Sequence, residues 1–448
     1  MKRKTAIWIG IIAGLILLGA VTQIFRICRT EMLRSRADAL LADGAYTQAG
    51  LLYISIGDLA NAARCDALQA EELYQDGISL LQAGDQEGAK KVLSLVSSYK
   101  DASALLAICD WQEALSLGDT EKLLDIHHGL QILGTNADLQ TALEQVSAAL
   151  FRQAEILAEA FELEGACKIW EELGSYGSSA LLLRRGQRAL DWADAPEAQR
   201  LLMPANRYLS EKLKNVYVCD QAYIVVPEEC GSETRFFLYF PGGRDEEMSV
   251  DYLLYYMMNP SPNTLAVFLR KNGLDHMRDK TCQAIDLMEQ AAAECGVFVR
   301  DLVAAGSSLG AYPAMHSVIY AFEEYGIKTE CVLSLDAGSD WMEAELLLNE
   351  SECRKAEKIG TTFYLFESPW VGMNRDGIRL MVNTGNQVIV VGCTFDDHVR
   401  ISLDAMGMGV VDWAVGDRSK PCNPEIYSFT RLEPEAEACS QQEAEGEP

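Results

Sequence analysis

The chain has 448 residues, enough for more than one domain, and 49% of them are apolar, so sizeable cores can form. Its formal net charge of −28 argues against a nucleic-acid partner, because binding to a phosphate backbone requires clustered lysine and arginine. No two of its 13 cysteines are spaced C-x-x-C, which excludes a zinc ribbon and a thioredoxin-like redox motif. We expect most of these cysteines to be buried thiols rather than parts of a disulfide framework.

The N-terminal segment predicts a membrane-spanning helix. Residues 5–25 carry no charged side chain over 21 positions, and Lys2, Arg3 and Lys4 precede them. A helix of this length crosses about 30 Å of hydrocarbon at about 1.5 Å per residue. A cleaved signal peptide is the alternative, but its apolar region is usually only about 7–15 residues long. We therefore assign residues 1–30 to a tail and a transmembrane helix.

The charges around this segment do little to fix its orientation. Arginines also follow the apolar run, so positive charge flanks both ends and the positive-inside rule nearly cancels. We expect a single-pass membrane protein whose bulk lies outside the cytoplasm, although unpaired cysteines favour a reducing compartment.

Residues 31–195 have a helical pattern that repeats. Residues 39–63 align with residues 79–103, and both copies are rich in alanine and leucine at three- and four-residue spacing. Gly44 and Gly84 fall at equivalent positions, where a glycine can end a helix in the left-handed conformation. One helix pair cannot bury its apolar face alone, so we expect several pairs to stack.

Two phrases of this region, G-D/A-x-x-x-A and S-Y-K-D-A, are similar to those of degenerate tetratricopeptide-type repeats. The resemblance implies an all-α domain of stacked helix pairs. Such arrays usually bind a partner, here a protein or peptide. A helical spacer without a partner is the alternative.

After a linker at residues 196–214, the period of the pattern changes. Across residues 215–430, short runs of β-branched and aromatic residues alternate with helical stretches, which predicts a mostly parallel sheet with helices on both faces. Residues 216–226 are expected to form a strand or a hairpin, and the other runs expected to form strands are residues 235–240, 264–270, 298–306, 330–336, 361–367 and 387–393. Residues 431–448 form an acidic, low-complexity tail that we expect to be disordered.

One motif in this region points to nucleophilic chemistry. Gly306, Ser308 and Gly310 have the spacing G-x-S-x-G, which is a weak signal by itself. Here the motif follows an apolar strand and opens a helix, the setting of a nucleophile elbow. The glycines leave room for a sharp turn, and backbone N–H groups at the start of the helix can stabilise an oxyanion. An ordinary serine in a glycine-rich turn is the alternative.

Two further features lie where such a site would need them. The stretch 239–243, with sequence YFPGG, ends an earlier strand and can bring backbone close to the serine. His398 follows the last expected strand, and it is one of only five histidines in the chain. A loop histidine is the alternative for His398.

With these residues, the C-terminal region resembles the α/β-hydrolase superfamily. The resemblance implies Ser308 as nucleophile and His398 as general base. It also implies the N–H groups of Leu309 and Gly243 as oxyanion donors.

The acid of the implied triad has several candidates. Asp376 lies in the loop after the penultimate expected strand and is the first choice. Glu367 could serve if that strand stops early, and Asp336, at the end of the preceding strand, is the third candidate. The family's usual G-x-x-D phrase is absent, so the sequence leaves this choice open.

These observations predict a membrane-anchored serine hydrolase that acts on a small acyl ester, of the esterase or deacetylase type. The small substrate follows from the short connections after Ser308, which leave no room for a large lid. We expect no metal and no cofactor, since neither a P-loop nor an H-E-x-x-H motif occurs. The alternatives are an acyltransferase on the same fold and a non-catalytic scaffold whose repeats recruit a partner.

Overall fold

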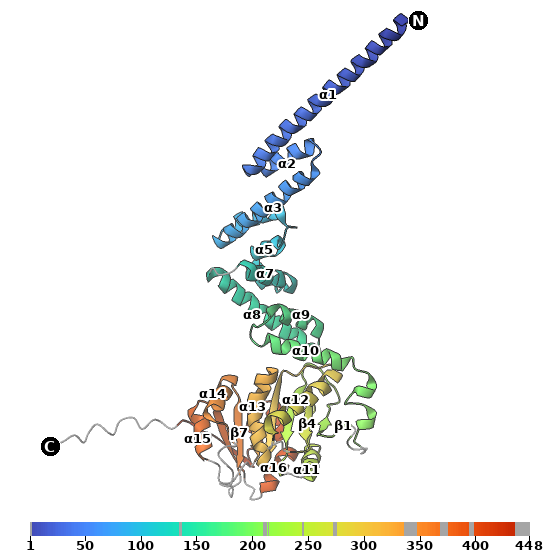
Figure 1. Cartoon of the computed structure of the whole chain (residues 1–448). Coiled ribbons are helices and arrows are strands. Elements are labelled where there is room, and N and C mark those ends of the chain that lie inside the picture. The colour runs from blue at the N-terminus through green and yellow to red at the C-terminus, as the bar shows by residue number, and fades with distance from the viewer. Residues whose placement is uncertain are drawn as a thin grey trace, which may run out of the picture. The chain divides into compact units, whose positions relative to one another are not determined.

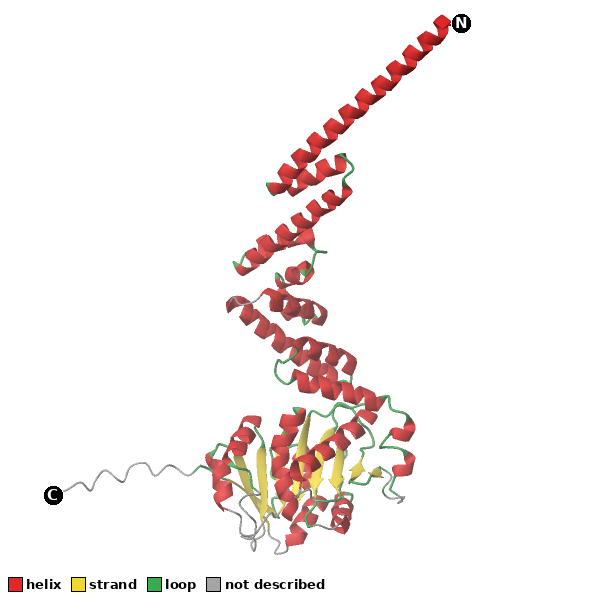
Figure 2. Ribbon diagram, viewed as in Figure 1, coloured by secondary structure: helices red, strands yellow, loops and turns green. Residues whose placement is uncertain are grey.

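The chain divides into two compact units, Met1–Leu150 and Phe151–Pro448. Figure 1 follows the course of the chain, and Figure 2 marks its helices and strands. The computed structural model describes residues 2–133, 137–208, 213, 215–243, 246–271, 276–335, 347–367, 375–393 and 398–434.

The first unit is built from helices that pack against helices next to them or one further along the chain. Small side chains let these helices approach closely, because Ala49 and Ala62 are buried around Tyr53 in one of the cores. The Tyr53 hydroxyl also bonds the carboxylate of Asp38. The helices are α1 (Lys2–Ala42), α2 (Tyr46–Ser55), α3 (Leu59–Gln82), α4 (Gln86–Leu93), α5 (Ala102–Ile108), α6 (Trp111–Leu117), α7 (Thr120–Leu133) and the first part of α8 (Ala137–Glu159), with a 3-10 turn η1 at Ser94–Val96.

Local signals in the sequence start and stop these helices. Gly44 and Gly84 have φ angles of 77° and 81°, so both take the left-handed conformation expected of them. Asp58 and Asp85 cap α3 and α4, since each carboxylate accepts a hydrogen bond from a backbone N–H in the first turn. The helix–turn–helix geometry expected at these glycines is therefore confirmed, while the tetratricopeptide class and the partner stay predictions.

Asp85→Ala is expected to loosen the start of α4. The Asp85 carboxylate accepts a bond of 2.9 Å from the N–H of Gly88, and loss of such a cap costs about 1 kcal/mol, or roughly fivefold in a local opening equilibrium. Amides of α4 should therefore exchange about fivefold faster in hydrogen–deuterium exchange of the full chain. Asp85→Asn, which still caps, should stay near the wild-type rate. Equal exchange rates in wild type and Asp85→Ala would contradict the assignment of Asp85 as the N-cap of α4.

The predicted membrane span is wrong. Across the described ranges, no helix is both long and apolar enough to cross a bilayer. The prediction considered only the uncharged run at residues 5–25, whereas α1 continues as one helix through charged residues such as Arg26 and Glu31. The expected single-pass membrane location is overturned by the same finding.

The first elements of the second unit are helices. After the end of α8 come α9 (Leu163–Leu173), α10 (Ser179–Ala193) and two 3-10 turns, η2 (Glu197–Gln199) and η3 (Pro204–Asn206). Arg185 of α10 is buried and its guanidinium bonds the carboxylate of Glu289 and the carbonyl oxygens of Val299 and Tyr325. This one side chain therefore ties α10 to three separate parts of the unit.

The sheet of the second unit is mixed. In the described part of the chain it has nine strands in the order β1-β2-β4-β3-β5-β6-β7-β8-β9. The run from β4 to β8 is parallel, whereas β1–β2, β2–β4 and β8–β9 pair antiparallel. The strands are β1 (Val216–Val218), β2 (Ala222–Val225), β3 (Arg235–Phe240), β4 (Thr264–Leu269), β5 (Asp301–Ser307), β6 (Lys328–Leu335), β7 (Thr362–Glu367), β8 (Gln387–Cys393) and β9 (Tyr427–Arg431).

This arrangement corrects the predicted fold class, an α/β-hydrolase fold with a mostly parallel, doubly wound sheet and one transmembrane helix. Composition locates the strands, but the length of each connection decides their direction. Of the strand or hairpin expected at residues 216–226, the structure has the hairpin of β1 and β2, because the connection at residues 219–221 is too short for a crossover. The sequence analysis also missed β9, which pairs antiparallel with β8.

Helices cover both faces of the sheet. Strand side chains alternate between two cores: Leu238 lies in one, whereas Phe237 and Tyr239 lie in the other. The first core is completed by α12 (Met277–Glu294), α13 (Ala311–Tyr325), α14 (Glu350–Ile359) and α15 (Arg375–Asn383). The second core is completed by α11 (Glu246–Tyr256), α16 (His398–Gly407) and α17 (Val410–Val415).

Candidate active site

The predicted site residues come after the carboxyl ends of parallel strands. These ends are level with one another, since Ser307 pairs in register with Leu335, and Leu335 with Phe366. The loops after parallel strands gather at one edge of the sheet, which is where open α/β sheets bind their ligands. In chain order, β3, β5, β6, β7 and β8 end at Phe240, Ser307, Leu335, Glu367 and Cys393.

Ser308 lies at a sharp turn between β5 and the following helix. It opens a 3-10 turn, η5 (Ser308–Gly310), that runs directly into α13. Its φ angle is +51°, a left-handed conformation that is uncommon for a residue with a side chain. Such strain costs on the order of 1–3 kcal/mol and persists only where the surroundings enforce it.

Two glycines enforce this turn. A Cβ on Gly306 would lie 2.0 Å from the carbonyl oxygen of Gly310, and a Cβ on Gly310 would lie 2.2 Å from that of Phe240. Both contacts are with backbone atoms, which cannot rotate away. The glycines of G-x-S-x-G are therefore required by close packing of β5, η5 and the end of β3.

The loop after β3 lies against the serine turn. A Cβ on Gly242 would lie 2.8 Å from the carbonyl oxygen of Ser307 and 3.1 Å from the Cβ of Ser308. The N–H of Gly242 donates a bond of 3.0 Å to Ser307 Oγ, so this donor is already engaged. Gly243 comes next, half-buried and left-handed with a φ angle of 67°. The structure thus brings the predicted oxyanion loop and Ser308 together.

Ser307 and Ser308 are adjacent but differ in role. Ser307 is fully buried, and its hydroxyl accepts a bond from the N–H of Gly242 and shares one of 2.8 Å with the Tyr239 hydroxyl. Both bonds engage the Ser307 hydroxyl within the core. Ser308 is half-buried at the turn. Ser308 is therefore the better candidate nucleophile of the pair.

A cluster of buried hydroxyls lies beneath the turn. The Tyr239 hydroxyl bonds Ser307 Oγ, and the ring of Tyr252 lies against that of Tyr239 with centroids 5.0 Å apart. Burial raises the pKa of both tyrosines above its usual value, so both hydroxyls keep their protons at neutral pH. We call Tyr239, Tyr252 and Ser307 the hydroxyl cluster.

Helix α16 begins at the same edge of the sheet. Ser402 Oγ donates a hydrogen bond of 3.4 Å to the carbonyl oxygen of Leu335, the last residue of β6. Leu335 is the register partner of Ser307, so the first turn of α16 lies close to the serine turn. His398 is the first residue of α16, one helical turn before Ser402, and its side chain falls outside the described part of the structure.

The three candidate acids have different positions. Glu367 is the half-buried last residue of β7 and pairs in register with Gly392 of β8. Asp376, the first choice from sequence, has a 96% exposed side chain in the first turn of α15, with an oxygen 3.8 Å from a guanidinium nitrogen of Arg379. Asp336 lies outside the described residues.

Leu309 is the second residue of η5, where the N–H groups of a helix start have no partner within the helix. Its predicted part as an oxyanion donor agrees with that position but stays a prediction. The hydroxyl cluster was not predicted from the sequence. Tyr239 and Ser307 stand within the motifs at residues 239–243 and 306–310, but nothing in the local spacing of Tyr252 marks it.

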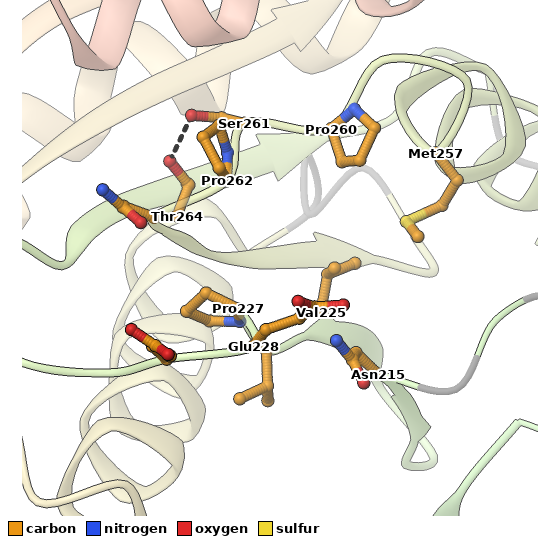
Figure 3. A pocket seen from close by; sticks show the side chains of 12 residues that line it. Asn215, Val225, Pro227, Glu228, Met257, Pro260, Ser261, Pro262 and Thr264 are labelled. Atoms are coloured by element: carbon orange, nitrogen blue, oxygen red, sulfur yellow. Dashed lines mark hydrogen bonds between the residues drawn. The ribbon is translucent and has the colours of Figure 1, made fainter.

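A separate pocket lies at the opposite edge of the sheet. It has a volume of about 580 Å³ and lies between the end of β2 and the start of β4, where Ser261 and Thr264 share a hydrogen bond of 2.8 Å (Figure 3). Glu228, Glu229 and Met257 are among the residues that line it. None of the predicted site residues lines it, so this pocket has no part in the chemistry of Ser308.

Among the residues that the structure describes, no three histidine, cysteine or carboxylate side chains gather to hold a metal ion.

Comparison of the sequence with protein-family models and with curated proteins found no match to either. The function of the chain is therefore inferred from its residues and their geometry.

Proposed function

We propose that the protein is a serine hydrolase that cleaves a small acyl ester, with Ser308 as its nucleophile. The observation that carries this proposal is the strained, left-handed Ser308 at a strand-to-helix turn framed by Gly306 and Gly310. A turn of this kind presents a serine hydroxyl above the edge of a sheet, and it is typical of nucleophile elbows. The resemblance to α/β-hydrolases in these residues supports the same chemistry.

In the proposed reaction, Ser308 Oγ attacks the acyl carbonyl carbon while His398 accepts the hydroxyl proton. His398 then gives that proton to the departing alcohol, which leaves an acyl-serine. Water repeats the sequence and releases the acid. The N–H groups of Leu309 and Gly243 would hold the oxyanion, since both residues come after strand ends at this edge.

Of the two described acids, Glu367 is the better candidate to orient His398. A triad acid is usually buried and hydrogen-bonded to the histidine, because an exposed carboxylate is solvated and weakly directing. Asp376 is almost fully exposed, whereas Glu367 ends β7 beside β8, the strand that leads to His398. We therefore place Glu367 first and Asp376 second.

The test is covalent labelling of the full-length protein with a fluorophosphonate, followed by intact mass and peptide mapping. We expect a single adduct on wild type, located on Ser308, and none on Ser308→Ala. Ser317→Ala is the matched control, because Ser317 is a buried serine of α13 whose hydroxyl bonds the local carbonyl of Ala314 at 2.6 Å. It should label like wild type.

Active wild type should then hydrolyse acetyl esters faster than octanoyl esters. Ser308→Ala should lower kcat at least about 1,000-fold, since the covalent step is lost. A folded wild type that forms no adduct, or a Ser308→Ala variant that still forms one, would overturn the proposal.

A further inference from the structure

Another pocket of the second unit lies between its helices and the start of β5. It is lined by the end of α8, by α9 and α10, and by the residues just before β5. Asp301, the first residue of β5, lines this pocket, whereas Ser308 follows the other end of the same strand. The pocket volume of about 240 Å³ is below the roughly 300–1,000 Å³ of sites for drug-sized molecules, so a small ligand fits best.

A buried hydrogen-bond donor lines this pocket without a partner. Trp170 of α9 is 1% exposed, and its indole N–H meets no acceptor among the described residues. The other edge of the indole is occupied, since a Cβ on Gly186 of α10 would lie 3.1 Å from Cζ3 of Trp170. Buried donors are nearly always hydrogen-bonded, because leaving one unpaired is unfavourable. The N–H edge, turned away from Gly186, is therefore the part of the ring that remains for a ligand.

The two arginines that line the pocket already have partners. The guanidinium of Arg185 bonds the carboxylate of Glu289 and two backbone carbonyl oxygens. Arg300 pairs with the carboxylate of Glu159, which lines the same pocket. An anionic ligand would have to compete with these bonds, so the pocket does not favour an anion.

Two carboxylates of the pocket have no such partner. Glu155 and Asp301 both line it, and neither forms an ion pair within the described part of the chain. Burial and the carboxylate of Glu159 raise the pKa of Glu155, while burial and the carboxylate of Glu330 raise the pKa of Asp301. A cation beside either group would offset these unfavourable effects.

Apolar side chains complete the wall. Leu182 of α10 and Phe298 are buried, and the ring of Phe298 lies 6.0 Å from that of Trp170 between centroids. A bare inorganic ion gains nothing from these surfaces, whereas a hydrocarbon group is stabilised by leaving water. The pocket therefore suits an organic cation.

We propose that this pocket binds a small primary amine in its ammonium form, which carries an apolar body and a neighbouring hydroxyl or carbonyl oxygen. The ammonium group pairs with Asp301, the half-buried carboxylate, while the exposed Glu155 lies nearer to solvent. The apolar body packs on Leu182, and the ligand oxygen accepts a hydrogen bond from the Trp170 N–H. This site goes beyond the proposed hydrolase function and does not rest on it.

The experiment titrates leucinol, an amino alcohol with an isobutyl group, into the full-length protein with isotope-labelled tryptophan. The indole N–H signal of Trp170 is followed by NMR, and it is identified among the seven tryptophans by its loss in Trp170→Phe. We expect this signal to move downfield and to saturate with a Kd of about 1 mM or below, which a ligand of this size can reach.

Two analogues each remove one group from leucinol. Isohexanol lacks the amine and should bind wild type at least about tenfold more weakly, because the bond to a charged group is lost. Isoamylamine lacks the hydroxymethyl group and should bind about fivefold more weakly, without the downfield movement of the Trp170 signal. Because both comparisons use wild type, no variant has to fold for the proposal to be tested.

A charge variant and its control locate the ammonium group. Asp301→Asn should weaken leucinol at least about tenfold, whereas Glu164→Gln, at an exposed carboxylate of α9 outside the pocket, should bind like wild type. A Trp170 signal that leucinol does not move, or equal binding of leucinol and isohexanol, would overturn the proposal. Neither result bears on fluorophosphonate labelling of Ser308, so the two proposals fail separately.

Discussion

Gly310→Ala is expected to destroy the reactivity of Ser308. The added methyl group would lie 2.2 Å from the carbonyl oxygen of Phe240 and 2.5 Å from that of Pro241, both of them backbone atoms. Relief therefore requires η5 and the end of β3 to move apart, which distorts the turn that holds Ser308 in its left-handed conformation. We expect the rate of fluorophosphonate labelling to fall at least about 100-fold, because a shift of about 1 Å suffices for that loss.

The same variant should lose about 1–3 kcal/mol of unfolding free energy, the usual cost of overpacking a filled site. Thermal unfolding and labelling kinetics on the same preparation measure both effects. Gly231→Ala is the control, because a Cβ at Gly231 would meet nothing within 4 Å. A Gly310→Ala protein that labels at the wild-type rate would show that the close contact at this turn does not hold Ser308.

Arg185→Met is expected to be the most destabilising single change in the second unit. The Arg185 side chain is 3% exposed and that of its partner Glu289 is 4% exposed, so the substitution leaves a buried carboxylate short of its main counter-ion. Removing one partner of a buried ion pair costs about 3–5 kcal/mol. The substitution also removes a contact with the ring of Phe298, 4.6 Å from the guanidinium carbon.

Urea unfolding followed by circular dichroism measures this loss as a lower midpoint for the second unit. Arg185→Met combined with Glu289→Leu is the informative comparison, since the double variant removes the stranded charge together with its partner. It should be more stable than Arg185→Met alone. A single variant as stable as wild type would mean that Arg188, whose Nη2 lies 3.3 Å from a Glu289 oxygen, satisfies the carboxylate unaided.

Much of the second unit can be predicted from local sequence. Each predicted run contains or overlaps a strand, because buried strands require continuous apolar, β-branched residues, as at Thr264–Leu269. Strand direction cannot be predicted in this way, since β2 and β4 look alike in composition but β2 runs antiparallel to β4. The membrane prediction rested on the uncharged run at residues 5–25, which is part of the longer helix α1, and no helix of the described residues is long and apolar enough to cross a membrane.

In the candidate site, too, local features could be predicted from the sequence and contacts between distant segments could not. The turn at Ser308 was predictable because Gly306 and Gly310 impose it within five residues of chain. The bond between the hydroxyls of Tyr239 and Ser307 joins segments far apart in the sequence, and no local pattern records it. The acid is a similar case, because burial separates Glu367 from Asp376 and spacing does not.

The buried ion pair of Arg185 also decides where the chain can be cut for expression. A fragment that starts after the linker at residues 196–214 would contain Glu289 and the carbonyl oxygens of Val299 and Tyr325 without the guanidinium that bonds them. A fragment that starts at Phe151 keeps α9, α10 and the complete second unit. Crystallisation and enzymology of the serine turn should therefore begin from the longer fragment.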